Sequence, residues 1–140
     1  MKRTGFRVLT SLIAVVILGM PVIYAGSEAI VSATIPFDFI VENKTLPAGQ
    51  YTVSALSQRG LIVRSEDAKS AVIALTMGVQ AKSANNGPRL EFSRYGSTYF
   101  LSKVWRGYDN QGHAIHKSKQ EREIALNQKS TGVTLTAQAR

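Results

Sequence analysis

The chain has 140 residues, and its 17 lysine and arginine residues outnumber its 9 acidic residues, which gives a formal net charge of +8. This length allows one domain and hardly more. The sequence contains no cysteine, which excludes disulfide bonds and thiolate metal sites. Hydrophobic residues make up 44% of the chain, a share typical of a globular protein and too high for wholesale disorder.

The first 25 residues have the three-part pattern of a secretory signal peptide. Three basic residues and no acid lie within the first seven positions, an apolar run follows over residues 8–20, and the small residue Ala25 ends the segment. We expect export to the periplasm or to the outside of the cell, with cleavage after Ala25 or, as second choice, after Ala29. An uncleaved membrane anchor is the alternative, because the apolar stretch approaches the roughly 18 residues of a spanning helix.

Removal of this segment takes three positive charges from +8 and leaves +5 on residues 26–140. The remaining basic residues are scattered, whereas a nucleic-acid-binding protein has them clustered, so we expect no nucleic-acid partner. The partners that suit this charge are an anionic envelope polymer, a glycan or a partner protein. A membrane is expected as a partner only if the signal stays uncleaved. The charge also favours solubility without any partner.

The first part of the mature chain predicts three strands. Residues 29–35 are rich in β-branched side chains, and Pro36 ends this strand or places it at an edge. Residues 37–41 alternate with the two-residue period of a half-buried strand. Proline and glycine suit a turn over residues 43–49, and the alternation resumes over residues 51–55 in a returning strand.

The middle of the chain predicts a short strand over residues 61–63 and a longer one over residues 71–77. Nearly every residue of the longer segment is apolar, so we expect that strand to be buried on both faces. Serine, asparagine, glycine and proline residues over 78–89 predict a loop.

Residues 90–95 and 98–105 predict a β-hairpin. Gly96 and Ser97 form its two-residue loop, and glycine in the first place indicates a type II′ turn. Strict alternation places one set of side chains of the second strand on one face, namely Tyr99, Leu101, Lys103 and Trp105. The opposite face then carries Phe100, Ser102 and Val104.

Residues 107–112 predict a loop, and a helix follows. Ser118 and Glu121 have the spacing of a capping box, so the helix begins at Lys119. Its apolar residues are adjacent in sequence rather than three or four apart, and we therefore expect it to dock weakly. Residues 130–140 form either a last strand or a loose tail.

Together these elements predict one mainly-β domain over residues 26–140. Six to eight short strands with tight turns are typical of a small antiparallel β-sandwich or barrel, here with one short C-terminal helix. No internal repeat is present.

The string Pro-Phe-Asp-Phe-Ile-Val-Glu-Asn-Lys-Thr-Leu-Pro-Ala-Gly-Gln-Tyr-Thr-Val over residues 36–53 resembles the opening of an uncharacterised family of small secreted acidobacterial β-proteins. Residues 61–67, 92–96, 99–105 and 117–123 are similar to later segments of that family. The resemblance implies a secreted β-protein and brings no activity with it.

Leu-Pro-Ala-Gly-Gln-Tyr-Thr-Val over residues 46–53 is also similar to strings in prealbumin-like sandwich modules of surface proteins. This second likeness covers about eight residues. Some such modules carry a lysine–asparagine crosslink, but Lys44 lies in a predicted turn, so we do not expect the crosslink here.

Two histidines, His113 and His116, have the spacing His-x-x-His, and Asp109 precedes them as a possible oxygen ligand. A zinc site needs three or four protein ligands, so surface histidines without a metal are the other interpretation. We expect no cofactor.

No catalytic set is apparent in the sequence. The acidic pair Glu66 and Asp67, like the pair Glu121 and Glu123, lies too close along the chain to face each other across a substrate. The sequence has neither a Gly-x-Ser-x-Gly nucleophile elbow nor a glycine-rich phosphate loop. We therefore expect a non-enzymatic protein.

Aromatic and basic side chains gather around the predicted hairpin and could stack on sugar rings or bind an anionic polymer. The candidate binding residues are Arg94, Tyr95, Tyr99, Lys103, Trp105, Arg106 and Tyr108. Core packing is the other explanation for the large aromatic residues.

The sequence thus predicts an exported, non-enzymatic β module with a binding or structural role in the cell envelope or outside the cell. One alternative is a metal-dependent activity through His113, His116 and Asp109. Another is a small-ligand carrier with a cavity inside a barrel.

Overall fold

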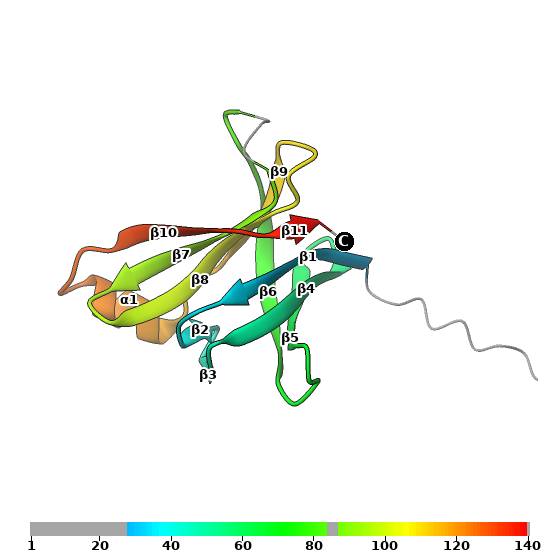
Figure 1. Cartoon of the computed structure of the whole chain (residues 1–140). Coiled ribbons are helices and arrows are strands. Elements are labelled where there is room, and N and C mark those ends of the chain that lie inside the picture. The colour runs from blue at the N-terminus through cyan, green and yellow to red at the C-terminus, as the bar shows by residue number, and fades with distance from the viewer. Residues whose placement is uncertain (1–27, 84–86, 140) are drawn as a thin grey trace, which may run out of the picture.

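The computed structural model describes residues 28–83 and 87–139. Strands make up 61% of the structure and helix 6%, which confirms a mainly-β fold with one short C-terminal helix. The strands form a single sheet that does not close into a barrel (Figure 1). The predicted signal peptide lies outside the described residues.

The structure contains eleven strands and one helix within the described residues, named here in chain order. They are β1 (Glu28–Ile35), β2 (Phe39–Val41), β3 (Lys44–Leu46), β4 (Gly49–Ser57), β5 (Gly60–Ser65), β6 (Ala71–Gln80), β7 (Arg89–Tyr95), β8 (Thr98–Trp105), β9 (Gln111–Ile115), α1 (Lys119–Ala125), β10 (Thr131–Thr136) and β11 (Gln138–Ala139).

The long strand β6 divides the sheet into two halves. Residues 71–75 of β6 pair with β5, and residues 76–80 pair with β9 on the opposite edge of β6. The first half continues from β5 through β4 and β1 to β11, and the second continues from β9 through β8 and β7 to β10. One core cluster joins them, since it contains Val53 of β4 and Leu61 of β5 together with Phe92 of β7. The sheet therefore folds over a shared core like a sandwich.

The β2–β3 hairpin lies between β8 and β6 and contacts both strands. Ile40 of β2 pairs in parallel with Phe100 of β8, while the other strand pairs are antiparallel. At the far side of the hairpin, the Glu42 carboxylate accepts a hydrogen bond of 3.1 Å from the backbone N–H of Leu75, where β6 passes from β5 to β9. The turn predicted over residues 43–49 is thus replaced by a tighter turn at 42–43, followed by strand β3.

The β7–β8 hairpin is present as predicted, with Gly96 at a φ of +62° in its two-residue turn. A bulge changes its second strand, because Glu91 pairs with Lys103 and Phe92 pairs with Leu101, which leaves Ser102 without a partner residue. The Ser102 hydroxyl instead donates a hydrogen bond of 2.8 Å to the carbonyl oxygen of Glu91.

This bulge shifts the alternation of β8 by one residue. Val104 joins Leu101 in the main core, whereas Lys103 and Trp105 lie on the opposite face with Phe100. The prediction that Leu101 and Trp105 share a face is therefore wrong.

The prediction that residues 71–77 are buried on both faces is also wrong. Val72, Ala74 and Thr76 are buried, but the side chains between them are largely exposed. The large apolar side chains of β6 that are exposed are Ile73, Leu75 and Met77. The first half of the sheet thus has a single buried face, although its longest strand is almost entirely apolar.

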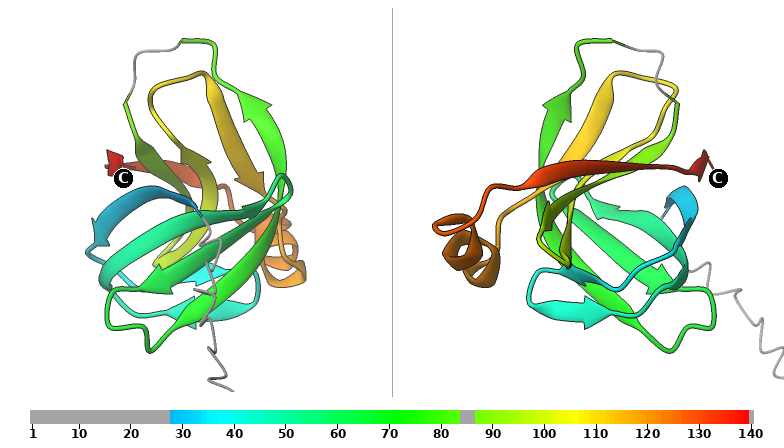
Figure 2. Two further views of the ribbon diagram at one scale, coloured as in Figure 1. Left: turned by 90° about the vertical axis from the view of Figure 1, so that its right-hand side faces the viewer. Right: turned by 60° about the vertical axis from the view of Figure 1, so that its left-hand side comes forward.

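The C-terminal segment is ordered and crosses between the two halves. Strand β10 pairs with β7 and β11 pairs with β1, so residues 131–139 do not form a loose tail. Between these strands Ala137 is buried, and its backbone N–H donates to the carbonyl oxygen of Pro88 at 2.9 Å. In Figure 2 this segment runs across the molecule from the helix to the edge beside β1.

Helix α1 begins at Lys119, as the capping box predicts. The Ser118 hydroxyl accepts the backbone N–H of Glu121 at 3.2 Å. The Glu121 carboxylate does not complete the capping box but accepts a hydrogen bond from the Tyr95 hydroxyl at 3.2 Å. Ile124 packs on a small cluster that includes Tyr95. Among the described residues, no helix has the length and apolar character needed to cross a membrane.

Candidate functional site

The two histidines have different surroundings. His113 on β9 is buried, and its Nδ1 lies 3.4 Å from the Thr76 hydroxyl. His116 follows β9 and is exposed, with its Nδ1 3.3 Å from the carbonyl oxygen of Leu75. Asp109 accepts the backbone N–H of Gln111 at 3.1 Å in a local turn. Over residues 28–83 and 87–139, no group of three or more histidine, aspartate or glutamate side chains is placed to hold a metal ion.

The predicted aromatic and basic surface is divided between several sites. Tyr95 is buried beneath α1, and the Tyr99 ring stacks on Phe37 with 3.8 Å between ring centroids. The Arg94 guanidinium lies 5.5 Å from the Tyr99 ring centroid near the hairpin turn. Lys103 instead faces outward, with its Nζ 3.9 Å from the carboxylate of Glu91. These four candidate residues do not share one surface.

The other three candidates lie near the end of β8 that is remote from the hairpin turn. Trp105 is buried, and the Arg89 guanidinium lies 4.6 Å from the centroid of its ring. The indole Nε1 is buried and has no hydrogen-bond partner among the described residues. Arg106 donates a hydrogen bond of 3.4 Å to the hydroxyl of Tyr108, which is 71% exposed.

A hollow of about 330 Å³ opens at this end of the molecule, and we call it the mouth hollow. Its walls are formed by Gln58, Gly78, Val79, Gln80, Arg106, Gln111, Gly112 and His113.

Strand pairing explains how this lining comes together. Gly78 pairs with His113 and Gln80 pairs with Gln111, so the end of β6 and the start of β9 meet side by side at the hollow. Figure 2 shows these strand ends rising above the rest of the sheet. Gln58 also lines the hollow and comes from the turn between β4 and β5, which is distant in sequence from this strand pair. The site therefore depends on three segments that are distant along the chain.

One positive charge lies in the wall of the mouth hollow, and the Asp109 carboxylate lies outside the wall but near His113. Arg106 is the one charged residue in its lining, and no carboxylate belongs to the lining. Burial lowers the pKa of His113 below its usual value of 6.5, the nearby Arg106 lowers it further, and Asp109 raises it in part. The imidazole is therefore neutral at pH 7. Amide groups, a neutral imidazole and a guanidinium can bind a polar or anionic group, and the lining contains no serine or cysteine nucleophile.

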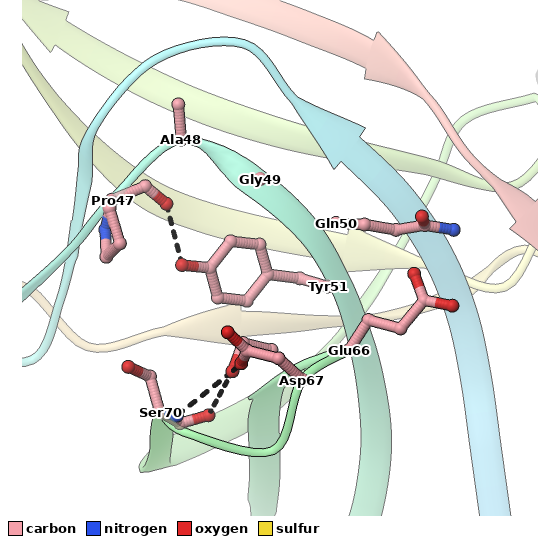
Figure 3. Close-up of a pocket in the computed structure, with 9 residues that line it drawn as sticks. Pro47, Ala48, Gly49, Gln50, Tyr51, Glu66, Asp67 and Ser70 are labelled. Carbon is pink, nitrogen blue, oxygen red and sulfur yellow. Dashed lines mark hydrogen bonds between the residues drawn. The ribbon is translucent and has the colours of Figure 1, made fainter.

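A second hollow of about 230 Å³ lies beside the turn after β5 (Figure 3). Its polar groups already have partners, since the Tyr51 hydroxyl donates to the carbonyl oxygen of Pro47 at 2.6 Å and Asp67 accepts from the Ser65 hydroxyl at 2.6 Å. This hydrogen bond from Ser65 is the main cause of the lowered pKa of Asp67. The side chains of Glu66 and Asp67 point apart in Figure 3, so they do not form a facing pair of carboxylates. These contacts stabilise the turn.

Comparison of the chain with protein-family models, with curated proteins and with solved structures found no match. The resemblance to the acidobacterial family and the likeness to prealbumin-like modules therefore stay predictions.

Sequence reasoning identified Arg106 and His113 but assigned them to two different hypotheses. It missed the three glutamines, which are separated by more than 20 residues along the chain and carry no local motif. Gln80 and Gln111 are neighbours only once the register of β6 and β9 is known. A polar residue at the end of an alternating strand is the only signal that could have suggested them.

Proposed function

We propose that the processed chain is an exported, non-enzymatic module that binds an acidic glycan in the mouth hollow. The observation that carries this proposal is the lining itself, which combines one guanidinium, one neutral imidazole and three amide side chains without a carboxylate. A fixed positive charge favours an anionic ligand, and the amides supply both donors and acceptors for hydroxyl groups.

The groups around Arg106 suit a sugar acid in particular. A guanidinium can bind a carboxylate with two parallel hydrogen bonds, which a point charge cannot do. The exposed ring of Tyr108 lies next to Arg106 and offers an apolar face for a pyranose ring. Anionic glycans are available to an exported protein, so this ligand class also agrees with the predicted compartment.

The alternative of a small-ligand carrier has less support. A carrier of that kind holds its ligand inside a barrel, but here large side chains occupy the space between the two halves of the sheet. Tyr51, Phe39 and Phe92 are among the largest fully buried side chains. The mouth hollow is an open site at the end of the sheet, which suits recognition of a chain end or of one unit of a polymer.

Titration with a glucuronic-acid oligosaccharide, followed by tryptophan fluorescence, tests the proposal. Trp105 is the single tryptophan of the chain, and its ring packs on Gly112, which lines the hollow, so we expect occupancy to change its emission. The Arg106→Gln variant is expected to bind about tenfold or more weakly, because it loses charge-assisted hydrogen bonds. The matched control is Arg94→Gln, which removes the same charge near the hairpin turn.

Two results would contradict the proposal. One is equal binding of the acidic oligosaccharide and a neutral glucose oligosaccharide of the same length. The other is an equal loss of affinity in the Arg106 and Arg94 variants, which would indicate a general charge effect instead of a site.

A further inference from the structure

Large aliphatic side chains, four of them exposed and one half-buried, gather on the outer face of β6 and of the neighbouring strands β4 and β5. We call this group the apolar stripe, and it consists of Leu56, Ile62, Ile73, Leu75 and Met77. Ile73 is 57% exposed, Leu75 66%, Met77 49% and Leu56 52%. Soluble proteins expose single apolar residues everywhere, but several in a row mark a surface that contacts something.

Strand register places several members of the stripe beside one another. Ile73 of β6 pairs with Ile62 of β5, so these two side chains lie beside each other on the outer face. Leu75 pairs with Gly60, which has no side chain. A Cβ at Gly60 would lie 3.8 Å from the Cβ of Leu56, so Leu56 borders Leu75 across this glycine. The Ser57 hydroxyl also lies at this point, with its oxygen 3.1 Å from the position of that Cβ.

Basic groups border the stripe. Arg59 lies in the turn between β4 and β5, and its backbone carbonyl oxygen accepts the N–H of Thr76. Arg64 pairs with Ala71, two residues before Ile73 on β6. Lys44 reaches the same end of β6, with its Nζ 3.5 Å from the carbonyl oxygen of Ala71. The ion pairs found within residues 28–83 and 87–139 are Arg89–Glu91 and Lys103–Glu91, and neither involves these three.

Two acidic residues also lie near the stripe. The Glu42 carboxylate is turned to the backbone N–H of Leu75, and Glu66 lies beyond Arg64 in the following turn. The turn between β5 and β6 adds one more charge of each sign, Asp67 and Lys69. Four basic groups then stand against three carboxylates, so the border of the stripe carries a net charge of +1.

We infer that the apolar stripe docks on the surface of an anionic lipid bilayer. In this arrangement the aliphatic side chains enter the headgroup layer, while Arg59, Arg64 and Lys44 lie against lipid phosphates. Apolar insertion combined with basic contacts is the physical basis of peripheral membrane binding.

The charge pattern favours a bilayer over a second copy of the chain. A symmetric dimer through the stripe would place the same basic border against itself, because a two-fold interface pairs identical patches. Like charges facing each other oppose association. The stripe also lacks the tyrosine, tryptophan and phenylalanine residues that are typical of the centre of a protein–protein interface.

The absence of cysteine allows a direct test with single-cysteine variants that carry an environment-sensitive dye. Each full-length variant is expressed, purified as the cells process it and labelled with the dye. It is then mixed with vesicles of phosphatidylcholine that contain phosphatidylglycerol. A dye at Leu75→Cys is expected to shift to shorter wavelength as it enters the headgroup layer. The reference is Ser97→Cys, an exposed position at the β7–β8 turn, where no shift is expected. An uncleaved N-terminal segment could itself bind the vesicles. The comparison of residues 75 and 97 still reports which face of the domain contacts lipid in that case.

Charge variants test the basic border. Arg59→Gln and Arg64→Gln are each expected to raise the lipid concentration at half-maximal shift about fivefold, the factor that corresponds to the contribution of one basic residue at an anionic surface. Lys119→Gln on α1 is the control and is expected to leave the lipid concentration at half-maximal shift unchanged. Pure phosphatidylcholine vesicles should produce little shift.

The inference is overturned if the dyes at residues 75 and 97 shift equally or if neither shifts. A shift at residue 75 that depends on protein concentration without vesicles, together with dimers in sedimentation, would assign the stripe to a second copy. Arg106→Gln serves to separate the two proposals, because it is expected to weaken glycan binding and to leave the vesicle response intact.

Discussion

At the scale of single residues, the packing of Trp105 on Gly112 is the contact with the clearest consequence. A Cβ at residue 112 would overlap the indole ring, so only glycine is compatible with the observed position of the ring. Gly112 lines the mouth hollow, and the contact therefore links core packing to the proposed site.

The Gly112→Ala variant is expected to unfold with a free energy about 1–3 kcal/mol lower than that of the native chain, because the ring must move. Its tryptophan emission should shift to longer wavelength as the indole becomes solvated. Denaturant unfolding and fluorescence spectra measure both effects. The control is Gly132→Ala in β10, where a Cβ would meet open space. An equal loss of stability in both variants would contradict the specific role of the Trp105 contact.

His113 gives the fold a predictable response to acid. Its pKa is lowered in the folded chain by burial and by Arg106, so below pH 6.5 the unfolded chain binds a proton that the folded chain does not. The free energy of unfolding therefore decreases as the pH falls from 7 through 6.5 towards the lower pKa of the folded state, and this contribution then levels off. The His113→Gln variant should lack this part of the pH dependence. Denaturant unfolding of both proteins between pH 7 and pH 5 measures it, and parallel curves would contradict the assignment.

At the scale of elements, the C-terminal segment joins the two halves of the sheet at their outer edges. Strand β10 extends the second half and β11 extends the first, and Ala137 lies buried between them. The segment covers two strand edges that would otherwise be free to pair with other chains. It therefore contributes to stability.

Two neighbouring aspartate substitutions test this role. Ala137→Asp places an unpaired carboxylate in the core and is expected to lower the free energy of unfolding by about 3 kcal/mol or more. Gln138→Asp introduces the same group at an exposed position and should cost little. Thermal and denaturant unfolding compare the two. If both variants were as stable as the native chain, the segment would not be docked in solution.

Strand β6 shows why an element can be identified while its environment is misjudged. Its β-branched and aliphatic residues correctly predict a strand, but the same composition suits a strand covered on both faces. Whether a second layer covers the outer face depends on elements elsewhere in the chain. Here the helix packs on Ile40, Tyr95 and Phe100 instead, and no element within residues 28–83 and 87–139 covers the outer face of β6.

At the scale of the whole molecule, the two halves of the sheet depend on one core. Residues of both halves contact each other in the same cluster, and β6 belongs to both. A chain of this size with one shared core is expected to unfold in a single cooperative step.

Hydrogen exchange of backbone amides measures this cooperativity. Amides of Val53 in the first half and Phe92 in the second should exchange with the same opening free energy, equal to that of global unfolding. Denaturant unfolding followed by tryptophan fluorescence and by far-ultraviolet circular dichroism should give coincident curves. Separate transitions for the two halves would contradict the idea of one shared core.

Local patterns in the sequence determined much of the fold. The alternation of side chains placed most strands, glycine in the first turn position located the β7–β8 hairpin, and Ser118 marked the start of α1. These features depend on backbone angles and hydrogen bonds between residues close in sequence, so they can be read without knowledge of distant partners.

Tertiary structure alone decided which faces are buried and which side chains meet. The bulge at Ser102 reversed the faces of Lys103 and Trp105, and the register of β6 with β9 brought His113 and the glutamines to one hollow. It also left Leu75 and its neighbours exposed. The register between paired strands sets these outcomes, because a shift of one residue moves every side chain to the other face.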